Sequence, residues 1–176
     1  MPSPAPRPGV PVPSALRATA WPAPIAPHGE GPRNGGIGML TLDDLVGTWE
    51  IVSYMLTRGD GTEYYPLGED CRAYLIYTAD GHVSAQMSAM GRPAYASRDL
   101  HEGTAGEMAA AAHGYVAYCG TYTLDLEHGD VIHNIDISMN PTWAGQSQAR
   151  HVSWDGEFLT ITADVNTARL VWRKVK

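Results

Sequence analysis

Hydrophobic and polar residues alternate along most of the chain after residue 39, in short segments separated by turn residues. Asp80-Gly81 and Asp155-Gly156 favour tight hairpin turns, because glycine tolerates a positive φ. A third turn falls at residues 127–130. Alternation of this kind is typical of strands with one buried face. The pattern predicts strands at about residues 47–57, 72–79, 82–90, 116–126, 131–139, 146–154, 157–163 and 168–174.

One segment between the third and fourth predicted strands has a helical pattern instead. Thr104 and Glu107 are spaced as a capping box, alanines follow at 109–112, and Gly114 offers a C-terminal stop. We therefore expect a helix of about ten residues, which either covers one mouth of a barrel or lies along its wall. The predicted fold is all-β, an eight-stranded antiparallel up-and-down β-barrel with this one short helix.

Residues 1–38 differ in composition from the rest of the chain. They hold ten of the 13 prolines, which remove backbone donors and restrict φ. Large apolar side chains are scarce there, so the segment cannot offset the entropy of ordering itself. We expect a disordered proline-rich extension at 1–38 and a compact domain at 39–176. Translation starting at Met39 and a ligand for an SH3-type domain are the alternatives.

The composition restricts the partners of the protein. Its 12 Lys and Arg residues against 19 Asp and Glu residues leave a net charge of −7, which argues against nucleic-acid binding. No apolar run approaches the roughly 20 residues of a membrane-spanning helix, and prolines interrupt any export signal. We therefore expect no membrane partner and a cytoplasmic location. Cys71 and Cys119 are expected to be reduced packing residues. No metal-ligand spacing or cofactor motif is present, so neither a metal nor a cofactor is implied.

The turns also predict which side chains face the barrel interior, since side chains alternate along a strand. They pair Leu124 with His133 and Val152 with Leu159. The inward set then includes polar residues among aliphatic and aromatic neighbours, namely His133, Arg150, Gln148, Tyr118 and Tyr122. A guanidinium inside an apolar face is costly unless it is paired or reached by water. Arg150 therefore either has a buried acidic partner, or the barrel is hollow enough to hold a ligand.

The strands on either side of Asp80-Gly81 are apolar on both faces. We assign Tyr77, Ser84 and Gln86 to the interior, where their hydrogen-bonding groups could orient a ligand. The opposite face would then form an outward apolar patch, through which the protein could form a homodimer. The residues of that patch are Tyr74, Ile76 and Met87.

Several motifs occur in a consistent order between residues 45 and 176. Gly47-Thr48-Trp49 lies on the first predicted strand, and the last carries Arg169 and Arg173 beside Trp172. A Gly-x-Trp with a cation near the indole resembles the lipocalin superfamily signature. Further motifs resemble the bacterial and fungal lipocalin-like domain family: Leu45-Val-Gly-Thr-Trp-Glu50, Tyr65-Pro-Leu-Gly68, Tyr74-Leu-Ile-Tyr77, Asp80-Gly-His-Val-Ser-Ala-Gln86, Tyr118-Cys-Gly-Thr-Tyr122 and Pro141-x-Trp143 followed by Gln148 and Arg150. Similarity to lipocalin-type enzymes of polyketide and terpenoid pathways implies small-molecule biosynthesis.

Candidate site residues follow from the predicted interior. His133 is the candidate for proton transfer, because an unperturbed histidine pKa of about 6.5 suits that role; a core histidine bonded to backbone or to a tyrosine is the alternative. Arg150 could bind a carboxylate or enolate oxygen, with a structural ion pair as its alternative. Tyr122 completes the catalytic candidates. The ligand-binding candidates are Trp49, Tyr77, Ser84, Gln86, Tyr118, Trp143 and Gln148.

Two classes of function fit this machinery. The predicted one is a cofactor-free cyclase, isomerase or dehydratase of secondary metabolism, in which the barrel folds a small substrate for an intramolecular step. His133 or a tyrosine would move the proton, while Arg150 and Gln148 would stabilise oxyanion charge. The alternative is a non-catalytic carrier of a small apolar acid anchored by Arg150. Haem binding through one axial histidine is a third interpretation.

Overall fold

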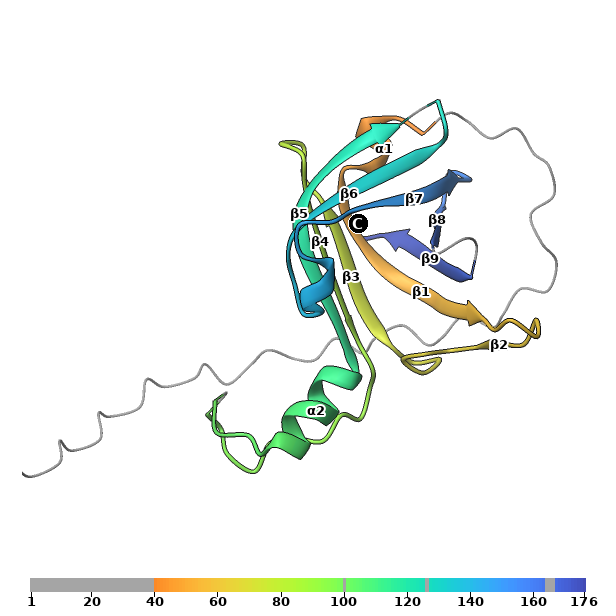
Figure 1. Cartoon of the computed structure of the whole chain (residues 1–176). Helices are drawn as coiled ribbons and strands as arrows, with labels where there is room; N and C mark the ends of the chain where they lie inside the picture. Colours follow the sequence, from red (N-terminus) through yellow and green to blue (C-terminus); the bar gives the residue numbers. More distant parts are fainter. Residues whose placement is uncertain (1–39, 100, 126, 164–166) are drawn as a thin grey trace, which may run out of the picture.

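The computed structural model describes residues 40–99, 101–125, 127–163 and 167–176. The predicted extension at 1–38 lies outside these residues. Most of the described chain forms one antiparallel sheet (Figure 1). Its strands are β1 (Gly47–Thr57), β2 (Glu63–Tyr64), β3 (Arg72–Tyr77), β4 (His82–Ser88), β5 (Tyr115–Asp125), β6 (Asp130–Ser138), β7 (Ser147–Trp154), β8 (Phe158–Ala163) and β9 (Ala168–Lys174).

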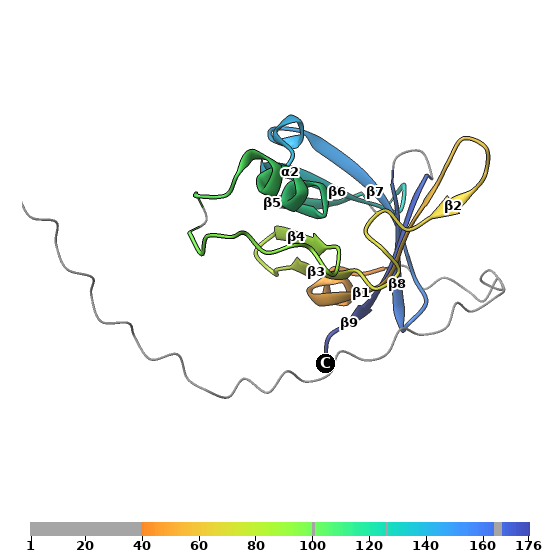
Figure 2. The same cartoon turned by 90° about the horizontal axis from the view of Figure 1, so that it is seen from below.

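The sheet closes into a barrel because its last strand pairs with its first. From β3 to β9 each strand pairs with the next one along the chain, and β1 joins β3 on one side and β9 on the other. The short β2 pairs only with the end of β1, at Leu56 and Thr57. Eight strands therefore form a closed wall, which is visible from two directions in Figures 1 and 2. The prediction of an all-β, eight-stranded antiparallel barrel is confirmed.

Helical structure is limited to short elements in the described part of the chain. The helix α2 (Ala105–His113) carries the predicted capping box between Thr104 and Glu107, and none of its residues is buried. The helix follows β4 along the chain; the strand numbers count the short β2, which the sequence did not predict. It extends beyond the ends of β4 and β5 (Figure 1). The sequence did not predict the helix α1 (Leu42–Leu45) or the 3-10 turn η1 (Pro141–Trp143).

The loop between β3 and β4 is longer than the predicted two-residue turn. The Thr78 N–H donates to the His82 carbonyl at 2.9 Å, and the Gly81 N–H donates to the Thr78 carbonyl at 3.1 Å. Gly81 has a φ of 87°. Three residues therefore form the loop, with glycine at its left-handed position, which is a common hairpin geometry.

This loop shifts the β3–β4 register by one residue from the prediction. Ser84 lies opposite Ile76, and Gln86 opposite Tyr74, both on the outer face. A one-residue shift moves every side chain of a strand to the other face of the sheet. The predicted inward placement of Ser84 and Gln86 is therefore wrong. Gln86 is exposed and accepts a hydrogen bond from the Tyr115 hydroxyl.

The same shift changes the predicted outward patch. Tyr74 and Ile76 are 43% and 37% exposed, as the patch requires, but Met87 is only 6% exposed and faces the interior. The outer face of this region thus has two of the three predicted members of the patch. A homodimer through this face stays a prediction.

The registers of the later hairpins differ from the prediction by two residues instead of one. His133 lies opposite Tyr122, not Leu124, and Val152 lies opposite Ile161, not Leu159. A two-residue shift keeps each side chain on its own face, because the period of a strand is two. The interior positions of His133 and Arg150 therefore follow the predicted pattern.

Alternate side chains of the barrel strands form one buried core. At one end, Leu45 of α1 packs in with Trp49, and both are fully buried. Full burial of each large apolar side chain stabilises the fold by about 1.5 to 3 kcal/mol. No helix in the described residues is long and apolar enough to cross a membrane.

Candidate ligand cavity

A cavity lies inside the barrel, between the inner faces of its strands. Its volume is about 70 Å³, whereas one water molecule needs roughly 10 to 15 Å³. Most of its wall is aliphatic, from Leu75, Ala85, Met87, Val116, Ile161 and Leu170. Tyr118, His133 and Arg150 contribute polar groups to the same wall. An apolar cavity with a few converging polar groups is the usual form of a small-molecule site.

His133 lies at the centre of a buried hydrogen-bond chain. It is 1% exposed, on the inner face of β6. Its Nε2 atom is 2.7 Å from the Tyr77 hydroxyl, and its Nδ1 atom is 2.9 Å from the Tyr118 hydroxyl. Both ring nitrogens are thus engaged by tyrosines, as in the predicted alternative of a core histidine. Neither nitrogen is free to ligate a haem iron.

Burial controls the protonation of this chain. It lowers the pKa of His133 from 6.5 to about 3, with a smaller contribution from the Arg150 charge. Burial also raises the pKa of Tyr118, although the Arg150 charge and a hydrogen bond from Arg150 act in the opposite direction. For Tyr77, burial raises the pKa well above its ordinary value. The imidazole and both phenols are therefore neutral at pH 7.

Arg150 reaches the cavity from β7 and has no acidic partner in the part of the chain that the structure describes. Its guanidinium donates to the Gln148 side-chain oxygen and, at 3.4 Å, to the Ala149 carbonyl. None of the ion pairs among the described residues includes Arg150. Of the two predicted alternatives for Arg150, the buried ion pair is therefore not observed among the described residues, and the barrel does contain a cavity. That this cavity holds a ligand stays a prediction. Gln148 holds the guanidinium without lining the cavity itself.

Trp172 is a polar member of the wall that the sequence prediction missed. It lies on β9, is 1% exposed and lines the cavity. Its Nε1–H is buried without a hydrogen-bond acceptor among the described residues. Alternation along the last strand predicts that Trp172 points inward. The lack of an acceptor for its N–H depends on which groups surround the indole once the barrel has closed, and the sequence does not show these.

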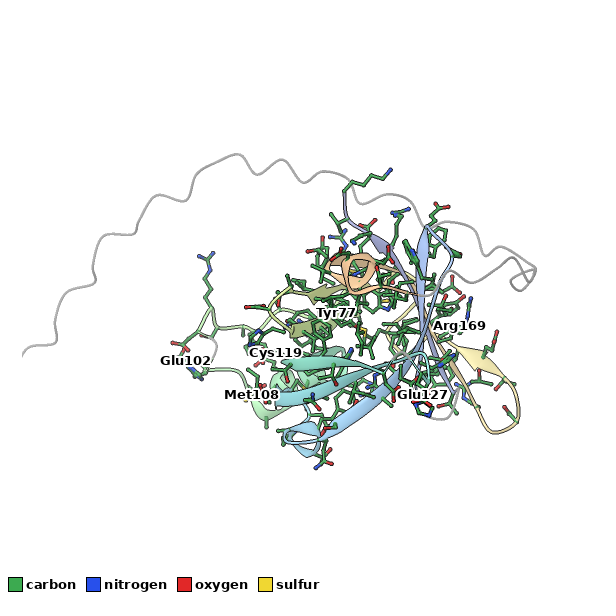
Figure 3. All side chains as sticks on the ribbon, turned by 90° about the horizontal axis from the view of Figure 1, so that it is seen from above. Tyr77, Glu102, Met108, Cys119, Glu127 and Arg169 are labelled. Atoms are coloured by element: carbon green, nitrogen blue, oxygen red, sulfur yellow. The ribbon has the colours of Figure 1, made fainter. Side chains whose placement is uncertain are left out.

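Three predicted site residues lie in the core outside the cavity wall. Trp49 donates from Nε1 to the Leu45 carbonyl at 2.8 Å. Tyr122 donates to the Thr78 carbonyl at 2.9 Å. Tyr77 is hydrogen-bonded to the cavity residue His133, and Figure 3 shows it among the side chains that fill the barrel. The predicted residues that do line the cavity are Tyr118, His133, Trp143 and Arg150.

Trp49 carries the cation contact expected from the first strand, with a different partner. The Lys174 Nζ atom lies 5.3 Å from the centroid of the indole ring, whereas Arg173 pairs with Glu50. A Cβ atom at Gly47 would lie 2.7 Å from Lys174 Cε, and Gly47 has a φ of 140°. Glycine at position 47, two residues before the tryptophan, therefore leaves room for this lysine.

Acidic, histidine and cysteine side chains do not cluster in the described residues in any group of three that could hold a metal ion. The cysteines, Cys71 and Cys119, are both free thiols. Burial raises the pKa of Cys71 to about 11, so this thiol is unreactive at neutral pH. The polar groups of the cavity are thus phenol, imidazole, indole and guanidinium, and both nitrogens of the imidazole are engaged by tyrosines.

Comparison with known proteins gives two results that agree with this geometry. The model of the lipocalin-like domain family matches residues 46–175, which include every strand of the barrel. The chain is also similar to the 4'-hydroxy-3'-methoxypropiophenone carrier protein ppsC of Aspergillus oryzae (strain ATCC 42149 / RIB 40). The two are 31% identical over 107 residues, which cover 53% of this chain and 96% of that protein. With its closed barrel and this match, the chain belongs to the lipocalin-like domain family.

Proposed function

We propose that the protein is a carrier that binds a small, largely apolar molecule in the barrel cavity and holds an oxygen atom of it with Arg150. The observation that supports this most strongly is the partly buried guanidinium of Arg150, which lies in a mostly aliphatic wall and has no carboxylate partner among the described residues. Withdrawing a charge from water in such surroundings is costly unless a polar group binds it. A planar guanidinium suits a carboxylate or an enolate oxygen.

The similarity to a carrier protein supports the same conclusion. The name of that relative specifies a propiophenone, an aromatic ketone with further oxygen substituents. Such a molecule combines a compact apolar body with a polar end. A body of this kind fits an aliphatic wall, and its oxygen fits the polar corner formed by Tyr118 and Arg150.

Catalysis by the predicted cyclase or isomerase mechanism has less support. A general base must accept a proton near the working pH. His133 has both nitrogens engaged by tyrosines and a pKa of about 3, so it remains neutral and weakly basic. The site therefore supports binding better than proton transfer, and carriage is our preferred function.

Calorimetric titration with benzoate tests the proposal, since benzoate combines a compact ring with a carboxylate. Arg150→Gln removes the charge and should weaken benzoate binding at least tenfold, because a hydrogen bond to a charged group contributes about 1.5 to 3 kcal/mol. Arg169→Gln is the matched control, since Arg169 is an exposed arginine of β9, and it should bind as the wild type does. Equal affinities of wild type and Arg150→Gln would contradict the role of Arg150.

A second measurement separates the carrier from the enzyme. A bound aromatic ketone or acid would be recovered and analysed by mass spectrometry after prolonged incubation. Unchanged ligand supports carriage. Conversion to a product that Arg150→Gln fails to form would contradict it and support the enzyme.

A further inference from the structure

We propose that the Tyr118 hydroxyl donates a hydrogen bond to the bound molecule, and that Tyr77 directs this hydrogen through His133, so that the cavity selects a carbonyl or carboxylate oxygen. This inference rests on the proposed function, because it assumes that the cavity takes a small molecule. It adds the chemistry of the recognised group and a positioning residue outside the cavity wall.

The donor and acceptor roles in this series of hydrogen bonds are fixed first at Tyr77. Its hydroxyl is buried, and its one hydrogen-bond partner among the described residues is His133 Nε2, at 2.7 Å. A buried hydroxyl hydrogen needs an acceptor, and a neutral imidazole has one accepting nitrogen. Tyr77 therefore donates, His133 accepts at Nε2, and the ring hydrogen of His133 is on Nδ1.

The role of His133 in turn fixes the role of the Tyr118 hydroxyl. With its hydrogen on Nδ1, His133 donates to the Tyr118 oxygen, 2.9 Å away. The positive charge of Arg150 acts on the same hydroxyl and offers it no acceptor, because a guanidinium can only donate. The Tyr118 oxygen thus accepts from His133, and its own hydrogen needs another acceptor. Because Tyr118 lines the cavity, that acceptor can be the bound molecule.

Trp172 provides a second donor to the same cavity. Its Nε1–H is fully buried without an acceptor among the residues described, and its ring forms part of the wall. With Arg150 and Tyr118, Trp172 makes up a group of three side chains in the wall that have a hydrogen left to donate. A ketone or carboxylate oxygen only accepts, so it complements them fully. An alcohol would bring a hydrogen of its own that also needs an acceptor.

Matched probes of one shape test the recognised group. Acetophenone and α-methylstyrene differ by C=O against C=CH2, and benzoate adds the anionic form of the acceptor. Calorimetry on the full chain should show acetophenone binding about tenfold more tightly than α-methylstyrene. Tyr118→Phe should reduce that ratio about fivefold, with α-methylstyrene affinity unchanged within twofold. Comparing the affinities of acetophenone and benzoate shows whether the neutral or the anionic acceptor is preferred.

The role of Tyr77 has a separate readout. Tyr77→Phe frees His133 Nε2, so the ring hydrogen can move there and Nδ1 can accept from Tyr118. The selectivity for acetophenone should then fall about threefold. The ¹⁵N chemical shifts of His133 should change from a pure Nδ1–H form to a mixture. Tyr115→Phe, a tyrosine on the outer side of β5 that bonds Gln86, should change neither quantity.

The failures of the two proposals are distinguishable. If wild-type protein binds acetophenone and α-methylstyrene equally well, the cavity takes small molecules but the donor assignment is wrong. Wild-type ¹⁵N shifts with the hydrogen on Nε2 would overturn the role of Tyr77. If acetophenone, α-methylstyrene and benzoate all fail to bind, the proposed function itself is overturned, together with this inference.

Discussion

Two regions of the barrel interior contain the same kinds of side chain, a buried tryptophan and a cation, but in different states of pairing. At the end of the barrel next to α1, which we call the solid end, Trp49 donates to the Leu45 carbonyl at 2.8 Å, and Lys174 donates to the Asp44 carbonyl at 2.8 Å. In the cavity, Trp172 lacks an acceptor among the described residues, and Arg150 lacks a carboxylate.

The contrast teaches which buried polar groups stabilise the fold and which are available to a ligand. A paired buried donor contributes to stability, whereas an unpaired one carries a desolvation cost of about 1 to 3 kcal/mol. The unpaired indole N–H, that of Trp172, occurs beside the cavity, and the paired one, that of Trp49, in the solid end of the barrel. Residue type alone would not separate Trp49 from Trp172, or Lys174 from Arg150.

The largest expected difference between the two regions is in packing. Trp49→Ala should reduce the free energy of unfolding by about 3 to 5 kcal/mol, because it leaves a large hole in the solid end. Trp143→Ala, at the partly buried edge of the cavity, should cost less than half as much. Urea denaturation followed by circular dichroism measures both. Equal losses would mean that the two ends are packed alike.

Acid should lower the free energy of unfolding through His133, which lines the cavity. The folded pKa is about 3 and the ordinary value is 6.5, so below pH 6.5 the unfolded chain binds a proton that the folded chain does not. The contribution of neutral His133 to stability is therefore complete above pH 6.5. It is lost towards pH 3, by about 1.4 kcal/mol per pH unit.

The variant that tests this acid effect is His133→Gln, measured by urea denaturation between pH 6 and pH 4. Its free energy of unfolding should fall less steeply than that of wild type. Surface carboxylates titrate in both proteins and cancel in the difference. Trp49→Phe should retain the steep wild-type slope, and parallel slopes for wild type and His133→Gln would contradict the buried neutral histidine.

The smallest expected difference tests the two indole N–H groups directly. Trp49→Phe removes a made hydrogen bond and leaves the Leu45 carbonyl unpaired, so it should cost about 1 kcal/mol more than Trp172→Phe. The same urea experiment measures this difference. If Trp172→Phe is the costlier change, its N–H has a partner in the folded protein, and the distinction between the two regions fails.

The sequence predicted the barrel well because its signals are local. Turn dipeptides and alternation located the eight strands, and the capping box located α2. The elements that it missed are β2, α1 and η1, which are two to four residues long. Elements of this length have too few positions for a periodic pattern.

The candidate site was predicted less completely. Register errors of two residues left His133 and Arg150 on the inner face. The error of one residue at the loop that contains Gly81 placed Ser84 and Gln86 on the outer face. The faces of β3 and β4 depended on one loop residue, because both faces are rich in apolar side chains and alternation could not choose between them.

By itself, the sequence determined an antiparallel barrel with a histidine and an arginine on its inner face, since turns and alternation act between near neighbours. Only the tertiary structure decided the partners of those groups. Tyr77 and His133 meet across 56 positions of the chain, and Trp172 has its surroundings only when β9 pairs with β1. Whether a buried donor finds an acceptor depends on closure of the barrel, which no local pattern encodes.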